Sequence, residues 1–237
     1  MKHRMTFMGL MISLSCLGQN VVIPQDYEAQ ENLRELGTGN GLGVVRTFDT
    51  RYEGVKGSPN VFEYWNPGEV HMRNKGRIAI AQMNYNCFQN EIVYLDPKSF
   101  EQMILNKYLV DFFRIFSEDT VLFVSVTFPG EPEPVFAQVL YNRNSQVYKV
   151  YKKEFLQANY EGGYSADRRY DEFVDKYDLY FRKHNEDMLY KLRKSVRSIN
   201  KAFDKHSAEI SSFINSHNLK FRSEDELVEL MNYYDSL

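Results

Sequence analysis

The feature that most constrains the fold is a series of short strand-like runs, separated by turn residues, in the region 57–155. Apolar and polar side chains alternate in these runs, which is typical of strands with one buried face. The predicted strands are 61–65, 69–72, 78–85, Glu91–Leu95, Val110–Phe116, 120–128, 135–141 and 146–155, with turns at 66–68, 73–76 and 142–145. Many short strands joined by turns predict an antiparallel sandwich, roll or barrel.

The periodicity changes after this series. Four side chains have helical spacing and predict a helix that begins at Ser165: Tyr170, Phe173, Val174 and Tyr177. Alternation returns at 177–181, which predicts a strand, and a turn at 184–187 leads to a partner strand at 188–192.

The C-terminal end has the spacing of helices. Apolar residues recur at helical intervals in 196–203 and again in 210–214, and Ser223 with Glu226 forms a capping box before a last helix. The predicted fold class is therefore α+β, mainly an antiparallel β sandwich, roll or barrel with a small helical C-terminal end at about 195–236. We expect 57–237 to form a single β-rich domain, preceded by an extended lead-in at 19–56.

The first 18 residues resemble a secretory signal peptide. Residues 2–4 are basic, residues 5–17 are mostly apolar, and Cys16 and Gly18 supply small residues at the two positions that a signal peptidase tests, for cleavage before Gln19. The apolar run is shorter than the 20 or so residues that cross a bilayer. We therefore expect an exported protein, periplasmic or secreted, with no further transmembrane segment. The alternatives are a lipoprotein anchored through Cys16 and an uncleaved anchor.

Composition limits the partners and the stabilising chemistry. Removal of residues 1–18 would leave 27 basic residues against 32 acidic ones, so the formal net charge would move from −3 to −5. Such a surface repels phosphate backbones, which argues against nucleic acid as a partner. Only Cys87 would remain, so no intramolecular disulfide could form and packing must stabilise the fold. The 17 Tyr and 17 Phe residues favour sheet.

Several short motifs resemble a family of uncharacterised exported proteins common in the Bacteroidetes. The motifs are Gly57-Ser-Pro59 with Phe62 and Trp65, then Met83-Asn-Tyr85-Asn86 before Glu91-Ile-Val, and the C-terminal stretches 213–220 and 225–234. The position after Ser-Pro departs from the family pattern, because Asn60-Val61 replaces the commoner aromatic and aliphatic pair. The resemblance implies export and a β-rich body, and it implies no activity.

Two groups of residues are candidates for binding. Trp65, Tyr85 and Asn86 combine aromatic rings with an amide and could contact a sugar or a peptide, although an aromatic sheet core explains such residues equally well. Four basic side chains recur at helical spacing and could meet anionic lipid or an acidic partner: Lys194, Arg197, Lys201 and Lys205. The alternative for this basic stripe is a solvated face of a docked helix.

No catalytic residue, metal site or cofactor is predicted. Cys87 lacks a surrounding nucleophile motif, and the scattered histidines lack the paired spacing of a zinc enzyme. The predicted function is therefore an exported, non-enzymatic protein that binds or supports a component of the cell envelope, either a protein or a glycan. The alternative is a hydrolase of an envelope polymer that uses paired carboxylates, for which the candidates are Glu63, Glu69, Glu131 and Glu133.

Overall fold

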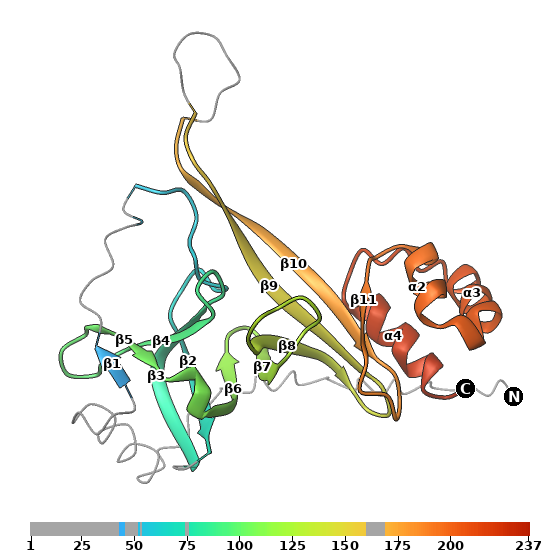
Figure 1. Ribbon diagram of the computed structural model, residues 1–237, viewed down its shortest axis with the longest axis horizontal. Coiled ribbons are helices and arrows are strands. Elements are labelled where there is room, and N and C mark those ends of the chain that lie inside the picture. The colour runs from blue at the N-terminus through green and yellow to red at the C-terminus, as the bar shows by residue number, and fades with distance from the viewer. Residues whose placement is uncertain (1–42, 46–51, 53, 74–75, 160–168) are drawn as a thin grey trace, which may run out of the picture.

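The computed structural model of the protein describes residues 43–45, 52, 54–73, 76–159 and 169–237 (Figure 1). The strands are β1 (Gly43–Val45), β2 (Asn66–Met72), β3 (Gly76–Asn86), β4 (Glu91–Leu95), β5 (Gln102–Leu105), β6 (Val110–Phe116), β7 (Thr120–Val126), β8 (Val135–Asn142), β9 (Gln146–Leu156), β10 (Glu172–Arg182) and β11 (Leu189–Leu192). The helices are α2 (Val196–Ala202), α3 (Ser207–Ser216) and α4 (Asp225–Tyr234), with short 3-10 turns η2 (Lys107–Leu109) and η3 (Asp204–His206).

These eleven described strands form one sheet, in the order β1-β5-β4-β3-β2-β6-β7-β8-β9-β10-β11. Every neighbouring pair is antiparallel. The predicted fold class is confirmed, because the chain is mainly antiparallel sheet and its helices lie near the C-terminus.

The sheet curls strongly around one core. β3 and β8 lie four strands apart in the sheet order, which corresponds to about 19 Å across a flat sheet. Nevertheless, the Tyr85 hydroxyl on β3 donates a hydrogen bond to the Phe136 carbonyl oxygen on β8, at 3.3 Å. Phe113 and Phe123, directly opposite on β6 and β7, stack inside the curl with ring centroids 4.7 Å apart. The concave face of the sheet therefore forms the main apolar core.

β9 and β10 form a long twisted hairpin that links the curled sheet to the helical end (Figure 1). Their register is unbroken from Gln146↔Arg182 to Leu156↔Glu172. The prediction of a helix through Tyr170, Phe173 and Tyr177 is therefore wrong, since β10 begins at Glu172 and Tyr170 is 65% exposed. Cross-strand pairs of aromatic residues, such as Phe173 with Phe155, favour the strand over the local helical spacing.

The helical end packs on the far part of this hairpin. Phe181 of β10 contacts Phe203, with ring centroids 4.7 Å apart, and both side chains are fully buried. Tyr234 of α4 lies against both rings. Ser195 caps α2, because its side chain accepts a hydrogen bond from the Ser198 N–H. This second core joins α2, α3 and α4 to the strands.

The first part of the sheet differs from the prediction in three places. Residues 61–64 are bends and Trp65 has no regular structure, so no strand forms there, and the predicted turn at 66–68 is the bulged start of β2. Gly68 is required there, because a Cβ atom would lie 2.4 Å from the Arg114 carbonyl oxygen. Strand β5 was not predicted; it follows a turn in which the Asp96 carboxylate accepts hydrogen bonds from two backbone N–H groups.

The predicted signal peptide, residues 1–18, lies outside the described residues, as does most of the predicted lead-in at 19–56. Ser165 also lies outside them. No helix among the described residues is long and apolar enough to cross a membrane.

Candidate ligand-binding groove

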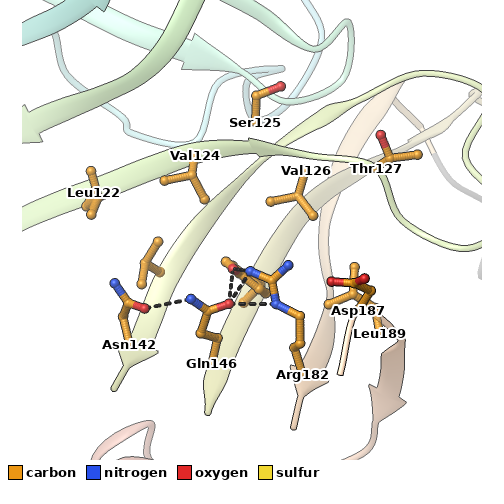
Figure 2. Close-up of a pocket in the computed structure, with 12 residues that line it drawn as sticks. Leu122, Val124, Ser125, Val126, Thr127, Asn142, Gln146, Arg182, Asp187 and Leu189 are labelled. Atoms are coloured by element: carbon orange, nitrogen blue, oxygen red, sulfur yellow. Dashed lines mark hydrogen bonds between the residues drawn. The ribbon is translucent and has the colours of Figure 1, made fainter. Parts of the chain in front are cut away.

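A groove of about 470 Å³ lies on the face of the sheet opposite the main core, between β7 and the adjoining ends of β8, β9 and β10 (Figure 2). Successive side chains of a strand point to opposite faces of the sheet. Phe123 of β7 points into the core, so its neighbours Leu122 and Val124 point into the groove and form its floor. The apolar lining residues come from three strands, β7, β8 and β11, and are Leu122, Val124, Val126, Val139 and Leu189. All five are only partly buried, so an apolar strip of sheet remains accessible.

The polar side of the groove is a row of side chains across three strands. Asn142 pairs with Gln146 between β8 and β9, and Gln146 pairs with Arg182 between β9 and β10. Residues that are directly opposite in neighbouring strands point to the same face, so the three side chains meet at one edge of the groove. Figure 2 shows them in line beneath the β7 side chains.

Hydrogen bonds hold this row in a fixed arrangement. Arg182 Nε donates to Gln146 Oε1 at 2.6 Å, and Arg182 Nη2 donates to the same oxygen and to the Tyr148 hydroxyl at 2.8 Å. The Tyr148 hydroxyl in turn donates to Gln146 Oε1 at 2.8 Å. Gln146 Nε2 donates to Asn142 Oδ1 at 2.8 Å. Arg182 is therefore oriented by neutral acceptors alone.

The charge of Arg182 has no counter-ion among the described side chains, since no carboxylate oxygen lies within 4.0 Å of its guanidinium nitrogens. Asp187 also lines the groove, and it makes no ion pair with Arg182. Burial raises the pKa of Tyr148, and the charge and hydrogen bond of Arg182 lower it, with a net rise. The Tyr148 hydroxyl therefore keeps its proton at neutral pH and donates to Gln146.

Two hydrogen-bonding groups of the row are left over. Arg182 Nη1 and Asn142 Nδ2 make no hydrogen bond to any residue that the structure describes. Both groups are donors, whereas the acceptors of Gln146 and Asn142 are occupied within the row. The groove therefore offers donors and one positive charge beside an apolar floor.

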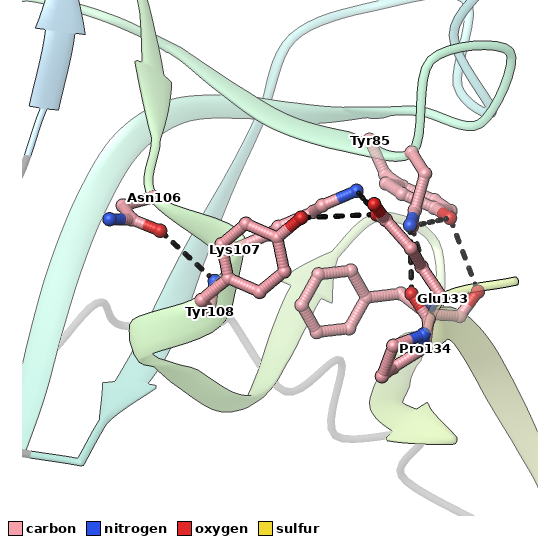
Figure 3. A network of polar contacts seen from close by, with 8 residues as sticks. Tyr85, Asn106, Lys107, Tyr108, Glu133 and Pro134 are labelled. Carbon is pink, nitrogen blue, oxygen red and sulfur yellow. Dashed lines mark hydrogen bonds and ion pairs between the residues drawn. The ribbon is translucent and has the colours of Figure 1, made fainter. Parts of the chain in front are cut away.

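The residues predicted for sugar or peptide binding lie away from this groove. Tyr85 is fully buried, and its hydroxyl bonds to Asn90 and to the Phe136 carbonyl oxygen (Figure 3). Asn86 is 5% exposed, and its side-chain oxygen accepts a hydrogen bond from the Gln89 N–H. Trp65 is partly buried just before β2. A binding role for these residues stays a prediction, and the interior positions of Tyr85 and Asn86 give it no support.

The basic stripe is divided by the structure. Arg197 and Lys201 are exposed on α2, but this helix ends at Ala202, so Lys205 lies on the separate turn η3. Lys194 precedes the helix and covers the Tyr177 ring, with Nζ 5.5 Å from the ring centroid. The prediction of one amphipathic helix carrying all four charges is therefore wrong. A binding role for the individual side chains stays a prediction.

Two of the candidate carboxylates, Glu133 and Glu69, are paired with neighbouring cations. Glu133 accepts hydrogen bonds from Lys107 and Tyr108, which lower its pKa (Figure 3). Burial raises the pKa of Glu69, but contacts with Arg114 and His71 outweigh burial and leave it lowered.

The other two candidates differ from each other. Glu131 forms an ion pair with Lys152 at 2.9 Å, and Glu63 is exposed. No group of three or more His, Cys, Asp or Glu residues that could hold a metal ion occurs in the described ranges. Burial raises the pKa of Cys87 to about 12, so this side chain is a neutral thiol.

Sequence reasoning missed Arg182, Gln146 and Asn142. The turn at 142–145 between the strands of Asn142 and Gln146 was predicted, but the groove also needs Arg182 of β10 to lie directly opposite Gln146. Comparisons of the chain with protein-family models, with curated proteins and with solved structures find no match.

Proposed function

We propose that the protein is exported and non-enzymatic, and that it binds a component of the cell envelope in the groove beside Arg182. The observation that carries the proposal is the partly buried guanidinium of Arg182, which has neutral hydrogen-bond partners and no carboxylate partner within the described residues. A charge removed from water is costly unless it is paired, so a site of this kind is completed by an anionic ligand. The groove volume also lies in the range of small-molecule sites.

The alternative, a hydrolase with paired carboxylates, has less support. A general acid in such an enzyme needs a raised pKa so that it holds a proton at neutral pH. Within the described ranges, the carboxyl groups that have shifted pKa values are Glu69, Asp96, Glu133 and Asp178, and all four are lowered.

The test is photo-crosslinking of the tagged full-length chain in its native cells. A benzoylphenylalanine replaces Thr127, an exposed residue that lines the groove, and in a matched control it replaces Phe100, which is 66% exposed and lies outside the groove. We expect an adduct with an envelope component at position 127 that is absent at position 100 and is lost when Arg182→Gln is added. The same adducts at both positions, or an adduct with a cytosolic molecule, would overturn the proposal.

A further inference from the structure

The middle of β10 has a neighbouring strand on one side only. β9 occupies one edge of β10 along its whole length, from Glu172 to Arg182. On the other edge, β11 pairs only with Leu179–Arg182, and Lys56 bridges to Glu172 at the far end. No described residue pairs with 174–178 between these two contacts. About 17 Å of strand edge is therefore open there.

The register identifies the backbone groups that face this open edge. The Phe173 N–H donates to the Lys56 carbonyl oxygen at 2.9 Å, so the backbone polar groups of Phe173 point away from β9. Alternate residues of an antiparallel strand direct their N–H and C=O groups the same way, so Asp175 and Tyr177 also face the open edge. Both residues are exposed. Two donors and two acceptors are thus available to an added strand.

A basic hollow lies where the open edge meets β11. β11 ends at Leu192, directly opposite Leu179, and the chain then continues to α2. The hollow has a volume of about 330 Å³, and its charged lining residues are three cations and one carboxylate: Lys191, Arg193, Lys194 and Asp178. The lining therefore has a formal charge of +2, in a chain whose formal net charge is −3.

Two of these cations are available to a ligand. Lys191 forms an ion pair with Asp178 at 2.8 Å, whereas Arg193 and Lys194 form no ion pair within the described ranges. Lys194 Nζ lies 5.5 Å from the centroid of the Tyr177 ring, so this ammonium group is on the Tyr177 face of the sheet. A residue directly opposite Tyr177 in an added strand would point to the same face. An acidic side chain at that position would therefore lie beside Lys194.

We propose that the open edge of β10 binds an acidic segment of a partner protein, which adds to the sheet as an extended strand. Its backbone pairs with Asp175 and Tyr177, and its acidic side chains lie at the end next to Arg193 and Lys194. The backbone hydrogen bonds supply affinity, and the two cations select the charge of the segment. The hollow and the groove beside Arg182 have no lining residue in common, so this surface is additional to the function proposed above.

The experiment is a titration of fluorescein-labelled peptides with the purified full chain, followed by fluorescence anisotropy. The probe is Thr-Val-Thr-Val-Glu-Glu. One comparison peptide ends in Lys-Lys instead, and another is the probe with N-methylated amides, which keeps the charge but cannot donate backbone hydrogen bonds. The N-methylated probe should bind about tenfold to thirtyfold weaker, because two hydrogen bonds to the edge are lost. The Lys-Lys peptide should bind at least about tenfold weaker, because its charge is repelled.

Two substitutions of Asp175 form a matched pair. Asp175→Ala and Asp175→Pro both remove the exposed carboxylate that pairs with Lys153, but only proline removes the N–H group at the open edge. Proline is tolerated in an edge strand where the N–H does not face the neighbouring strand. Asp175→Ala should not weaken probe binding, whereas Asp175→Pro should weaken it about tenfold.

A charge variant covers the case in which Asp175→Pro fails to fold. Lys194→Glu should weaken probe binding at least about tenfold and strengthen binding of the Lys-Lys peptide. Lys98→Glu is its control, because it changes the net charge equally at an exposed turn before β5. This control should leave probe affinity within about twofold.

Three results would overturn the proposal. Equal affinity for the probe and its N-methylated copy would mean that charge attraction acts without strand addition. Equal affinity for the probe and the Lys-Lys peptide would remove the role of the cations. Absence of probe binding would refute the peptide, and binding to phosphatidylglycerol vesicles that is lost in Lys194→Glu would then assign the basic hollow to a membrane surface.

Discussion

Asn84 of β3 attaches the irregular segment 61–65 to the sheet. It is 2% exposed, and its side chain accepts a hydrogen bond from the Phe62 N–H at 3.2 Å. Its amide nitrogen donates to the carbonyl oxygens of Phe62 and Tyr64, at 2.8 and 3.1 Å. Phe62 in turn packs against the main core. We therefore predict that Asn84→Ala destabilises the whole protein rather than this segment alone.

The magnitude follows from the number of hydrogen bonds lost. Each of the three bonds to the segment contributes about 1 kcal/mol net, and the Tyr85 N–H loses the same side-chain oxygen as an acceptor, so the free energy of unfolding should fall by at least about 3 kcal/mol. Tyr64 is 72% exposed, so its carbonyl oxygen can recover water and the loss should not greatly exceed this value. For a chain of about 200 residues, 3 kcal/mol lowers Tm by about 6–12 °C.

The assay is thermal and urea unfolding of the chain lacking residues 1–18, followed by circular dichroism. Asn66→Ala is the matched control, because Asn66 donates one exposed hydrogen bond, at 2.7 Å, to the same Tyr64 carbonyl oxygen. This control should cost no more than about 1 kcal/mol. If Asn84→Ala costs no more than Asn66→Ala, the segment does not depend on Asn84 and the reasoning is refuted.

The remaining predictions concern three other buried sites. Glu69→Gln breaks the contacts with Arg114 and His71 and should cost about 3 kcal/mol at pH 7 by urea unfolding. Because the pKa of Glu69 is lowered in the folded state, the ionised carboxylate stabilises the fold above pH 4.5, and this contribution is lost as the pH falls. The free energy of unfolding of Glu69→Gln should therefore fall less in acid than that of the wild type. Cys87, with a pKa of about 12, should react with iodoacetamide at pH 8 at least about 100-fold slower than free cysteine, and an equal rate in the folded protein would contradict its burial. Gly68→Ala should lower the free energy of unfolding by about 2 kcal/mol or more, and a neutral result would mean that β2 and β6 lie further apart.

The strands that the sequence predicts best are those bounded by local turn signals. Glu91–Leu95 and Val110–Phe116 coincide with β4 and β6, and 135–141 lies within β8. In each case the alternation of apolar side chains and the turn residues indicate the same boundary. The three C-terminal helices were predicted from apolar spacing, and the Ser223 side chain predicted to cap the last of them accepts a hydrogen bond from the Glu226 N–H.

The misassigned helix shows where local reasoning fails. Phe173 and Tyr177 are separated by four residues, which suits one face of a helix and also one face of a strand. The choice is made by β9, whose Phe155 and Tyr151 lie directly opposite these two residues. A pattern within one segment contains no information about the segment that will pair with it, so long-range pairing overrides local spacing.

The groove could not be predicted for a related reason. Asn142, Gln146 and Arg182 are unremarkable polar residues along the chain, and Arg182 is 36 positions from Gln146. They meet only because β8, β9 and β10 pair in one register, and a shift of one residue would turn each side chain to the opposite face. The predicted site at Trp65, Tyr85 and Asn86 rested on residue type, and residue type does not indicate whether a side chain such as Tyr85 is buried.

The end of β10 links the groove to the helical C-terminus. Phe181 and Arg182 are consecutive, so their side chains point to opposite faces of the sheet. Phe181 is fully buried against Phe203 and Tyr234, while Arg182 faces the groove. The packing that holds Phe181 therefore also holds the backbone of Arg182 in place. The hydrogen bonds to Gln146 and Tyr148 then set the side-chain angles of Arg182. On this reasoning the helices would support the proposed binding without touching the groove, because loosening their contact with Phe181 would also release Arg182 from its position beside the groove.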